Sequence, residues 1–444
     1  MKLLLEKIFK ITDSGSTVKT ELIAGSTTFF TMAYIIFVQP AVLSSAGMNF
    51  GAVMAATCIS AAFASIMMGL FANYPIALAP VMGENFFFAF TVVIALGVKW
   101  ETALGIVFIS GILFLLMSLF DVRELLINSI PPSLKSGITV GIGLFIAFIG
   151  LVYAGVVEKS PGGILKIGHL DKTYVIVALI GLVLISVLKY FNIKGALIIG
   201  MVVSAIASIP LGVSEFHGFV SLPPSLEPTF MKMNLVDVFT LKHIPLVIVF
   251  LFMLMFDTVG TVVGVTEQAG LVDKNGNIKN IKRILITDST ATVAGAVLGT
   301  STVSAYIESS AGVNVGGRTG LSAVTTGVLF LTALFFEPLV KMLGGGFSVN
   351  STVLYPVIAP ALIVVGSMMI SHLSKIDYSD ITEYLPAYLI IIGIPFTYSI
   401  ADGLAFGFIF YPVLKILTGK IREISKVMIF LGLIFILRYI FLNY

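Results

Sequence analysis

The sequence predicts an all-α protein that crosses a membrane many times. Of its 444 residues, 58% are hydrophobic and only 11% are charged. Soluble domains average about 45–50% apolar and about 25% charged residues. Apolar runs of about 20 residues, each long enough to cross a hydrocarbon layer, recur from Leu22 to the C-terminus. The net charge of +3 indicates no nucleic-acid partner, and the single cysteine, Cys58, rules out an internal disulfide or a cysteine metal site.

Hydropathy predicts fourteen membrane spans and one further apolar stretch at 425–442. The spans lie near residues 22–45, 51–72, 76–96, 101–120, 133–156, 173–190, 195–211, 244–267, 282–300, 302–316, 319–343, 353–372, 383–397 and 400–418. Basic residues gather in segment 1–21 and in the even-numbered connections, for example Lys189, Lys194 and Arg283. Because basic residues mark the cytoplasmic side, we expect the N-terminus inside the cell and the protein in the plasma membrane.

Two of the predicted spans are broken. Span three, "YPIALAPVMGENFFFAF", begins with two prolines that keep their preceding residues out of a helix, and a helix then starts near Gly83–Glu84–Asn85. Span ten, "TSTVSAYIESSAGVNVGG", begins with β-branched and hydroxyl residues, and its helix starts near Glu308–Ser309. Each is therefore predicted to be a short strand followed by a half-helix.

The two broken spans hold equivalent places, third in a first set of seven spans and third in a second set. An odd number of spans per set predicts two inverted repeats. Irregular backbone at membrane depth is tolerated where it lines a cavity, and matched interruptions in two inverted halves point to the binding site of a transporter.

Four carboxylates lie inside predicted spans: Glu84, Asp257, Asp288 and Glu308. Even mild scales put the cost of an aspartate at mid-bilayer at about 2.5–3.5 kcal/mol, so such residues are functional candidates. We expect Glu308 and Asp257 to belong to the site. For Glu84 and Asp288 the sequence leaves two roles open, a site residue or a hydrogen-bonded lock between helices, and the hydroxyl neighbours of Asp288 favour the lock.

Catalytic, metal and cofactor sites are not expected. The histidines His169, His217, His243 and His372 lie in or beside connections without a ligand-like partner at metal spacing. The chain has no nucleophile–base pattern, no Walker motif and no dinucleotide fingerprint. Uphill transport must then be coupled to an ion gradient. Titratable carboxylates at depth favour H⁺, and Na⁺ also suits oxygen ligands.

Five stretches carry a resemblance to a known family. They are "AGSTTFFTMAYIIFVQP" (24–40), "IALAPVMGENFFFAF" (76–90), "FDTVGTVVGV" (256–265), "TSTVSAYIESSAGVNVGGRTGL" (300–321) and "TYSIADGLAFGF" (397–408). With them the sequence resembles the nucleobase–cation symporter-2 family of the nucleobase–ascorbate transporter superfamily, in its hypoxanthine–adenine–guanine (azaguanine-resistance-like) permease branch.

The resemblance implies fourteen spans in two inverted repeats of seven, divided into two domains. Spans 1–4 (22–120) and 8–11 (244–343) would form a core domain. Spans 5–7 (133–211) and 12–14 (353–418) would form a gate domain that mediates homodimerisation. Residues 1–21 would be a cytoplasmic segment, and residues 419–444 a cytoplasmic or interfacial one.

The resemblance also implies which residues hold the substrate. Glu308, Asp257 and Asn85 match the family positions that bind the nucleobase, and Glu84, Ser309, Thr27 and Phe256 complete the candidate set. Asp257, Glu308 and Asp288 are the candidates for proton coupling. One departure stands out, because the usual span-three motif resembles G-M-G-L-N-A, whereas residues 81–86 read "VMGENF" and add the carboxylate of Glu84.

The expected function is proton-coupled import of adenine, guanine or hypoxanthine by an elevator or rocking movement of the core against the gate. One alternative is a uracil or xanthine permease of the same fold. Another is an inorganic anion carrier, which the acids Asp257, Glu308 and Glu84 argue against because they would repel the cargo. An intramembrane enzyme is disfavoured by the missing catalytic pairs.

Overall fold

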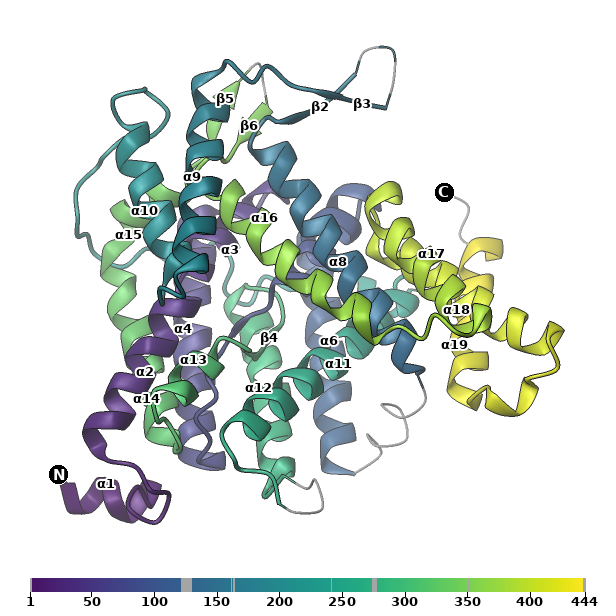
Figure 1. Ribbon diagram of the computed structural model, residues 1–444, viewed down its shortest axis with the longest axis horizontal. Coiled ribbons are helices and arrows are strands. Elements are labelled where there is room, and N and C mark those ends of the chain that lie inside the picture. Colours follow the sequence, from purple (N-terminus) through teal and green to yellow (C-terminus); the bar gives the residue numbers. More distant parts are fainter. Residues whose placement is uncertain are drawn as a thin grey trace.

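A computed structural model of the protein describes residues 2–120, 130–160, 162, 164–240, 242–273, 278–349 and 352–441. Within these ranges the chain is mostly helical and carries three two-stranded sheets (Figure 1). Long helices run through the body of the molecule, and the N-terminal helix α1 lies across the start of α2 at one edge (Figure 1).

The first half of the chain contains nine α-helices and three strands in its described part. They are α1 (Lys2–Phe9), α2 (Val18–Met32), α3 (Ile35–Ser45), α4 (Phe50–Met67), β1 (Leu78–Pro80), α5 (Met82–Phe86), α6 (Trp100–Leu119), α8 (Pro132–Tyr153), β2 (Val157–Lys159), β3 (Leu165–Ile167), α9 (Thr173–Tyr190) and α10 (Ala196–Ser208). Helix α4 continues as a π-helical turn over Met68–Ala72, and α5 as a π-helical segment over Phe87–Ala95.

The second half of the chain contains nine α-helices and three strands in its described part. Its elements are α11 (Ile244–Gln268), α12 (Ile281–Leu298), β4 (Val303–Ala305), α13 (Ser309–Asn314), α14 (Gly320–Ala333), α15 (Glu337–Gly344), β5 (Phe347–Val349), β6 (Thr352–Leu354), α16 (Ala359–Met369), α17 (Ile381–Thr397), α18 (Ile400–Leu417) and α19 (Lys426–Phe441). A short 3-10 turn at Asp237–Phe239 precedes α11. Three others, at Leu334–Phe336, Ile370–Lys375 and Ile421–Glu423, follow α14, α16 and α18 respectively.

Eight helical segments of the described chain are long and apolar enough to cross a membrane, and five shorter apolar helices accompany them. The predicted class, a mostly helical polytopic membrane protein, is confirmed. The exact count of fourteen spans and the two repeats of seven stay predictions. Within the unassigned stretch at 425–442, residues Lys426–Phe441 form the helix α19. It packs on α18 through a stacked pair of rings, Phe408 and Phe435, with centroids 5.7 Å apart.

The two segments predicted to be broken both begin with a strand and continue as a helix. Strand β1 pairs with β4 in antiparallel register, with Leu78 opposite Ala305 and Pro80 opposite Val303. The pairing extends at both ends, because the Val81 amide donates to the Thr302 carbonyl at 3.1 Å and the Tyr306 amide donates to that of Ala77 at 2.9 Å. Since the strands are antiparallel, α5 and α13 start at opposite ends of this small sheet.

Two other predicted spans are interrupted in a way that the hydropathy did not reveal. Span one divides into α2 and α3 at Ala33–Tyr34. There the Ile36 amide donates to the Ala33 carbonyl and the Phe37 amide to the Tyr34 carbonyl, so these hydrogen bonds reach back three residues instead of four. Span eleven breaks before α15, whose second residue is Pro338. That proline has no amide hydrogen and cannot donate the helical hydrogen bond to the Leu334 carbonyl, which accounts for the interruption.

Helix packing divides the described chain into two groups. One contains α2–α6 and α11–α14, and the other contains α8–α10 and α16–α18. The second group is tied together where α8 crosses α16 at Gly143 and Gly366, since a side chain at either glycine would collide with the backbone carbonyl of the other. Small residues of this kind let two membrane helices approach closely.

Candidate functional site

Glu308 lies at the start of α13 and is held by a residue of span one. It occupies the N-cap position of α13, and its Oε1 accepts a hydrogen bond of 2.7 Å from the Tyr34 hydroxyl. Tyr34 stands at the break between α2 and α3, which brings its buried ring toward the half-helix. The Thr31 hydroxyl also approaches the backbone carbonyl of Glu308, at 3.4 Å. The interruption of span one therefore positions the carboxylate of span ten.

Asn85 lies in α5, across the small sheet from the segment that precedes β4. Its side-chain oxygen accepts a hydrogen bond from the Ser301 hydroxyl. Gln39 of α3 donates to the hydroxyls of Thr300 and Ser301 at 2.9 and 3.0 Å. These contacts fix which way the Asn85 amide points. Its buried nitrogen, Nδ2, has no hydrogen-bond partner within the described residues.

Asp257 lies near the middle of α11, and its surroundings are acidic. The carboxylates of Glu84, Asp288 and Glu308 are all close enough to Asp257 for their charges to repel its own. Its buried oxygen, Oδ2, accepts no hydrogen bond within the described part of the chain. Gathering four carboxylates at membrane depth is costly unless protons or a ligand with hydrogen-bond donors relieve the repulsion.

Asp288 is fully buried and is bound on several sides by its neighbours. One oxygen accepts from the Thr258 hydroxyl at 2.5 Å, and the other accepts from the Ala305 amide at 2.8 Å. The Ser304 hydroxyl bridges to both oxygens at 2.9 and 3.1 Å. The carboxylate of α12 thereby joins α11 to strand β4, which supports the lock rather than the ligand role.

Glu84 and Ser309 lie at the starts of the two half-helices. Glu84 is the third residue of α5 and is 2% exposed. Ser309 opens α13, and its hydroxyl accepts a bond of 3.0 Å from the Ala77 amide, on the strand opposite. Ser309 therefore stabilises the junction of strand and half-helix, and that bond leaves its O–H hydrogen available to a ligand.

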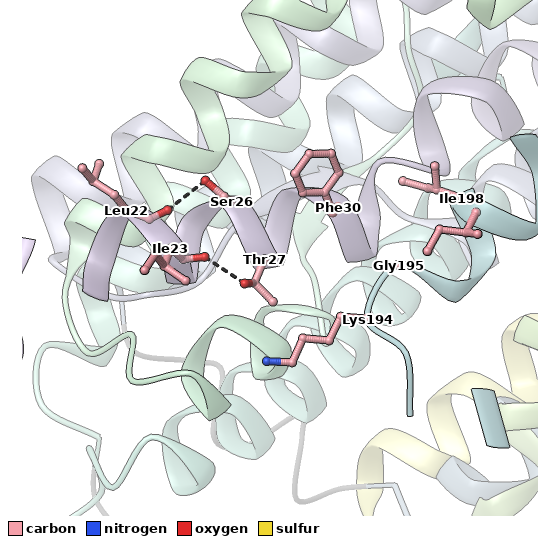
Figure 2. Close-up of a pocket in the computed structure, with 9 residues that line it drawn as sticks. Leu22, Ile23, Ser26, Thr27, Phe30, Lys194, Gly195 and Ile198 are labelled. Atoms are coloured by element: carbon pink, nitrogen blue, oxygen red, sulfur yellow. Dashed lines mark hydrogen bonds between the residues drawn. The ribbon is translucent and has the colours of Figure 1, made fainter. Parts of the chain in front are cut away.

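Phe256 and Thr27 have neighbours that were not expected. The Phe256 ring stacks on Phe252 with centroids 6.0 Å apart, and the ammonium of Lys135 from α8 lies 5.6 Å from its centre. Thr27 lines a groove between α2 and α10, and its hydroxyl donates to the Ile23 carbonyl at 2.8 Å (Figure 2). The substrate roles of both residues stay predictions. On α2 it is Thr31, one turn further along, that reaches Glu308.

Several polar residues of this region were missed by the sequence reasoning. They are Tyr34, Gln39, Thr258, Thr300, Ser301 and Ser304. A signal existed for Gln39, because an amide within the apolar run "YIIFVQP" must find partners inside the protein. Nothing in the sequence distinguished Thr258 or Ser304 from the many hydroxyl residues of transmembrane helices.

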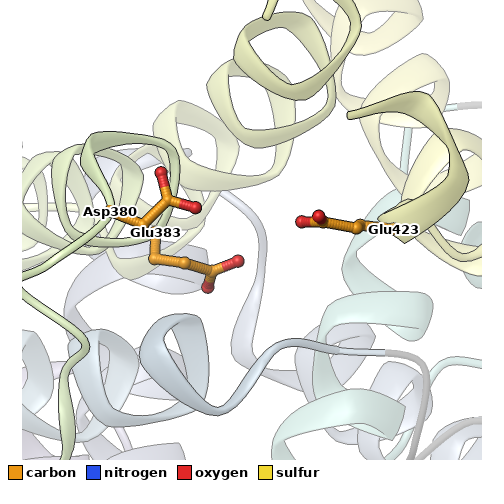
Figure 3. Close-up of side chains that lie close together, drawn as sticks. All are labelled: Asp380, Glu383 and Glu423. Atoms are coloured by element: carbon orange, nitrogen blue, oxygen red, sulfur yellow. The ribbon is translucent and has the colours of Figure 1, made fainter. Parts of the chain in front are cut away.

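Three further carboxylates come together at the far end of the second group. Asp380, Glu383 and Glu423 offer oxygens within 4.8 Å of one another, close enough to hold a metal ion (Figure 3). The ammonium of Lys415 already contacts Glu383 and Glu423 at 2.8 and 2.6 Å. The hydrogen bond from Lys420 at 2.6 Å, with that of Thr382, holds the pKa of Asp380 well below its usual range. The ion pairs of this cluster therefore connect α17, α18 and the segment before α19.

The family is decided by the sequence comparison. The model of the Permease family, Xan_ur_permease, matches residues 19–406. The chain belongs to this family, the nucleobase–ascorbate transporters. Its relatives include the adenine permease AdeP of Escherichia coli (strain K12), 44% identical over 99% of this chain and 97% of that protein. The guanine/hypoxanthine permease PbuO of Bacillus subtilis (strain 168) is 44% identical over 97% of this chain and 99% of that protein.

Solved structures support the fold. The transmembrane domain of a cyanobacterium bicarbonate transporter, BicA, matches with a TM-score of 0.62 at 16% identity, covering 86% of this chain and 97% of that one. The predicted core-and-gate type of membrane fold is thereby confirmed. Since the family and its relatives are permeases, the protein is a transporter and not an enzyme.

Proposed function

We propose that this permease is a secondary active transporter that imports purine nucleobases, namely adenine, guanine or hypoxanthine, by proton symport. The relatives named as adenine and guanine/hypoxanthine permeases support the substrate class. The proposed site residues are Glu308, Asp257 and Asn85, with Glu84, Ser309 and Phe256 beside them. Thr27 stays a candidate from the family resemblance, and its side chain lines the groove between α2 and α10.

The observation that carries the proposal is a buried donor and a buried acceptor that both lack partners. They are Nδ2 of Asn85 and Oδ2 of Asp257. A buried polar group without a hydrogen-bond partner costs about 1–3 kcal/mol. A protein keeps such atoms where a ligand supplies the missing hydrogen bond. A neutral purine suits this site because its ring N–H and exocyclic amino groups donate to carboxylates, while its ring nitrogens or carbonyl accept from the amide.

The acidic surroundings favour H⁺ as the coupling ion. A proton carried with the substrate relieves the mutual repulsion of Asp257, Glu84, Asp288 and Glu308 during the crossing. Asp257 is our first candidate for the proton carrier because its buried oxygen accepts no hydrogen bond from the described residues. Glu308 stays charged to accept from the purine, and Na⁺ is the alternative coupling ion.

In the movement that we propose, each of the two packing groups moves as a unit relative to the other. Residues 22–120 and 244–343 act as the core, and residues 133–211 and 353–418 act as the gate and dimerise, as the family resemblance implies. The core slides or rocks against the gate and carries the site across the plasma membrane, with segments 1–21 and 419–444 on the cytoplasmic side. The denser packing within each group than between them supports this division.

An inorganic anion carrier is the second candidate, because the protein of similar fold is a bicarbonate transporter. The acids around Asp257 argue against it, since an anion would be repelled by each of them. Uracil and xanthine present hydrogen-bonding edges similar to those of adenine, guanine and hypoxanthine. Only competition between substrates therefore separates a uracil or xanthine permease of the same fold from the transporter that we propose.

Substrate uptake tests the proposal directly. We expect cells that express the protein to accumulate radiolabelled adenine, guanine or hypoxanthine above the external concentration, and a protonophore to abolish the accumulation. Unlabelled xanthine, uracil and bicarbonate serve as competitors. Preferential uptake of uracil or xanthine would assign the alternative substrate class, and transport of bicarbonate without any purine uptake would overturn the proposal.

Replacing Asp288 should affect stability more than substrate choice. In Asp288→Asn an amide NH₂ would face the donors Thr258, Ser304 and Ala305, at a cost on the order of 1.5–3 kcal/mol for each charged hydrogen bond lost. We expect a lower unfolding temperature in detergent and an unchanged order of competing nucleobases. Asp171→Asn, at an exposed carboxylate, is the control. A changed order of competitors in a folded variant would make Asp288 a ligand residue.

A further inference from the structure

A groove of about 420 Å³ separates α2 from α10 and is not part of the acidic site. Its walls are Leu22, Ile23, Ser26, Thr27 and Phe30 of α2, together with Lys194, Gly195, Ile198 and Ile199 at the start of α10 (Figure 2). The groove therefore lies where the two packing groups meet.

The lining of this groove suits an apolar chain rather than a purine. Both hydroxyls are occupied, because Ser26 donates to the Leu22 carbonyl at 2.9 Å and Thr27 donates to that of Ile23 at 2.8 Å (Figure 2). Apolar side chains are exposed in the groove, for example Phe30, which is 57% exposed. A hydrogen-bonding solute would gain little from such walls, whereas an acyl chain would cover them.

The same strip of α2 carries a second groove, of about 510 Å³, lined by Thr17, Val18, Lys19, Leu22 and Ile23. Since Leu22 and Ile23 line both grooves, the two are adjacent along α2, and we call them together the channel, from Lys19 to Phe30. At 1.5 Å per residue this stretch of helix is roughly 16 Å long. That is about half the thickness of a hydrocarbon layer, the depth of one leaflet.

Two ammonium groups border the channel, and no acid is among its lining residues in the described part of the chain. Lys19 stands at its beginning on α2, and Lys194 reaches toward α2 from the other wall (Figure 2). A lysine stem can lie along apolar surface while its ammonium turns to a headgroup, so each of these two residues can bind an anionic group. The channel thus combines apolar walls of one-leaflet depth with positive charge.

We propose that this channel binds an anionic phospholipid, with its phosphate at Lys19 and Lys194 and an acyl chain along Leu22, Ile23 and Phe30. The lipid lies between α2 of one packing group and α10 of the other. Any displacement of these groups therefore changes the walls of the lipid site, so that the bound lipid stabilises the arrangement described here.

Native mass spectrometry of the purified full-length chain tests this without any transport measurement. Phosphatidylglycerol and phosphatidylcholine with identical acyl chains are added in turn. We expect selective retention of phosphatidylglycerol, and a loss of about fivefold in its affinity for each of Lys19→Gln and Lys194→Gln. The control is Lys172→Gln with Lys232→Gln, two exposed lysines outside the channel.

A third variant and a soluble probe complete the test. Ile198→Trp fills the channel without changing charge and should weaken phosphatidylglycerol retention. Glycerol 3-phosphate, which has the anionic group but no acyl chain, should not compete. Equal retention of both lipids, unchanged phosphatidylglycerol retention when Lys19→Gln and Lys194→Gln are combined, or competition by glycerol 3-phosphate would overturn the proposal. Purine uptake plays no part in these readings, so failure here leaves the proposed function untouched.

Discussion

Replacing Glu308 by glutamine should weaken purine binding by about 10- to 150-fold. This range corresponds to on the order of 1.5–3 kcal/mol, the contribution of a hydrogen bond to a charged group. Glutamine keeps the size and one acceptor oxygen of the side chain but loses the charge. It also turns an NH₂ group toward either the Tyr34 hydroxyl or the donor groups of the purine. Equilibrium binding of a labelled purine to purified protein measures the loss.

Two further variants, a comparison and a control, accompany this measurement. Tyr34→Phe removes the 2.7 Å bond to Glu308 while leaving the carboxylate in place, and we expect a smaller loss of affinity. Glu215→Gln changes the same chemical group at an exposed position and should bind as the unmodified protein does. Unaltered affinity in a folded Glu308→Gln variant would remove Glu308 from the site.

The sequence predicted the parts of the site that are costly to bury. Carboxylates such as Glu308 and Asp257 are conspicuous inside apolar runs, and the prolines of span three marked the backbone break. The antiparallel contact of β1 with β4 joins residues more than two hundred positions apart, and only the matched interruptions of spans three and ten hinted at it.

The faces of the helices were harder to predict, for a physical reason. A membrane helix is about as apolar toward lipid as toward its protein neighbours, so hydrophobic periodicity does not tell which side faces the site. Thr27 and Thr31 lie one turn apart on nearly the same face of α2, so the sequence pattern does not separate them, although only Thr31 contacts Glu308. Tyr34 owes its position to a break that no proline or glycine marks.

The other large effect concerns coupling, and the change is Asp257→Asn. Asparagine resembles a protonated aspartate in shape and neutrality but cannot take up or release a proton. We expect this variant to bind purines and to exchange labelled for unlabelled purine across a proteoliposome membrane. Accumulation against a gradient driven by a pH difference should be lost. An exchange assay and an accumulation assay on the same vesicles separate the two properties.

The physical basis is the cost of moving charge through the membrane. If Asp257 stayed ionised during the crossing, its charge would be repelled by those of Glu84, Asp288 and Glu308. Protonation of Asp257 removes its negative charge for each passage through the membrane. Asparagine makes that neutral state permanent, so the empty and loaded carrier move alike and the pH difference no longer drives transport. Retained accumulation in Asp257→Asn would assign the proton to Glu308 or Glu84. Accumulation driven by Na⁺ alone, at equal pH on both sides, would replace H⁺ with Na⁺ as the coupling ion and leave the purine site as described.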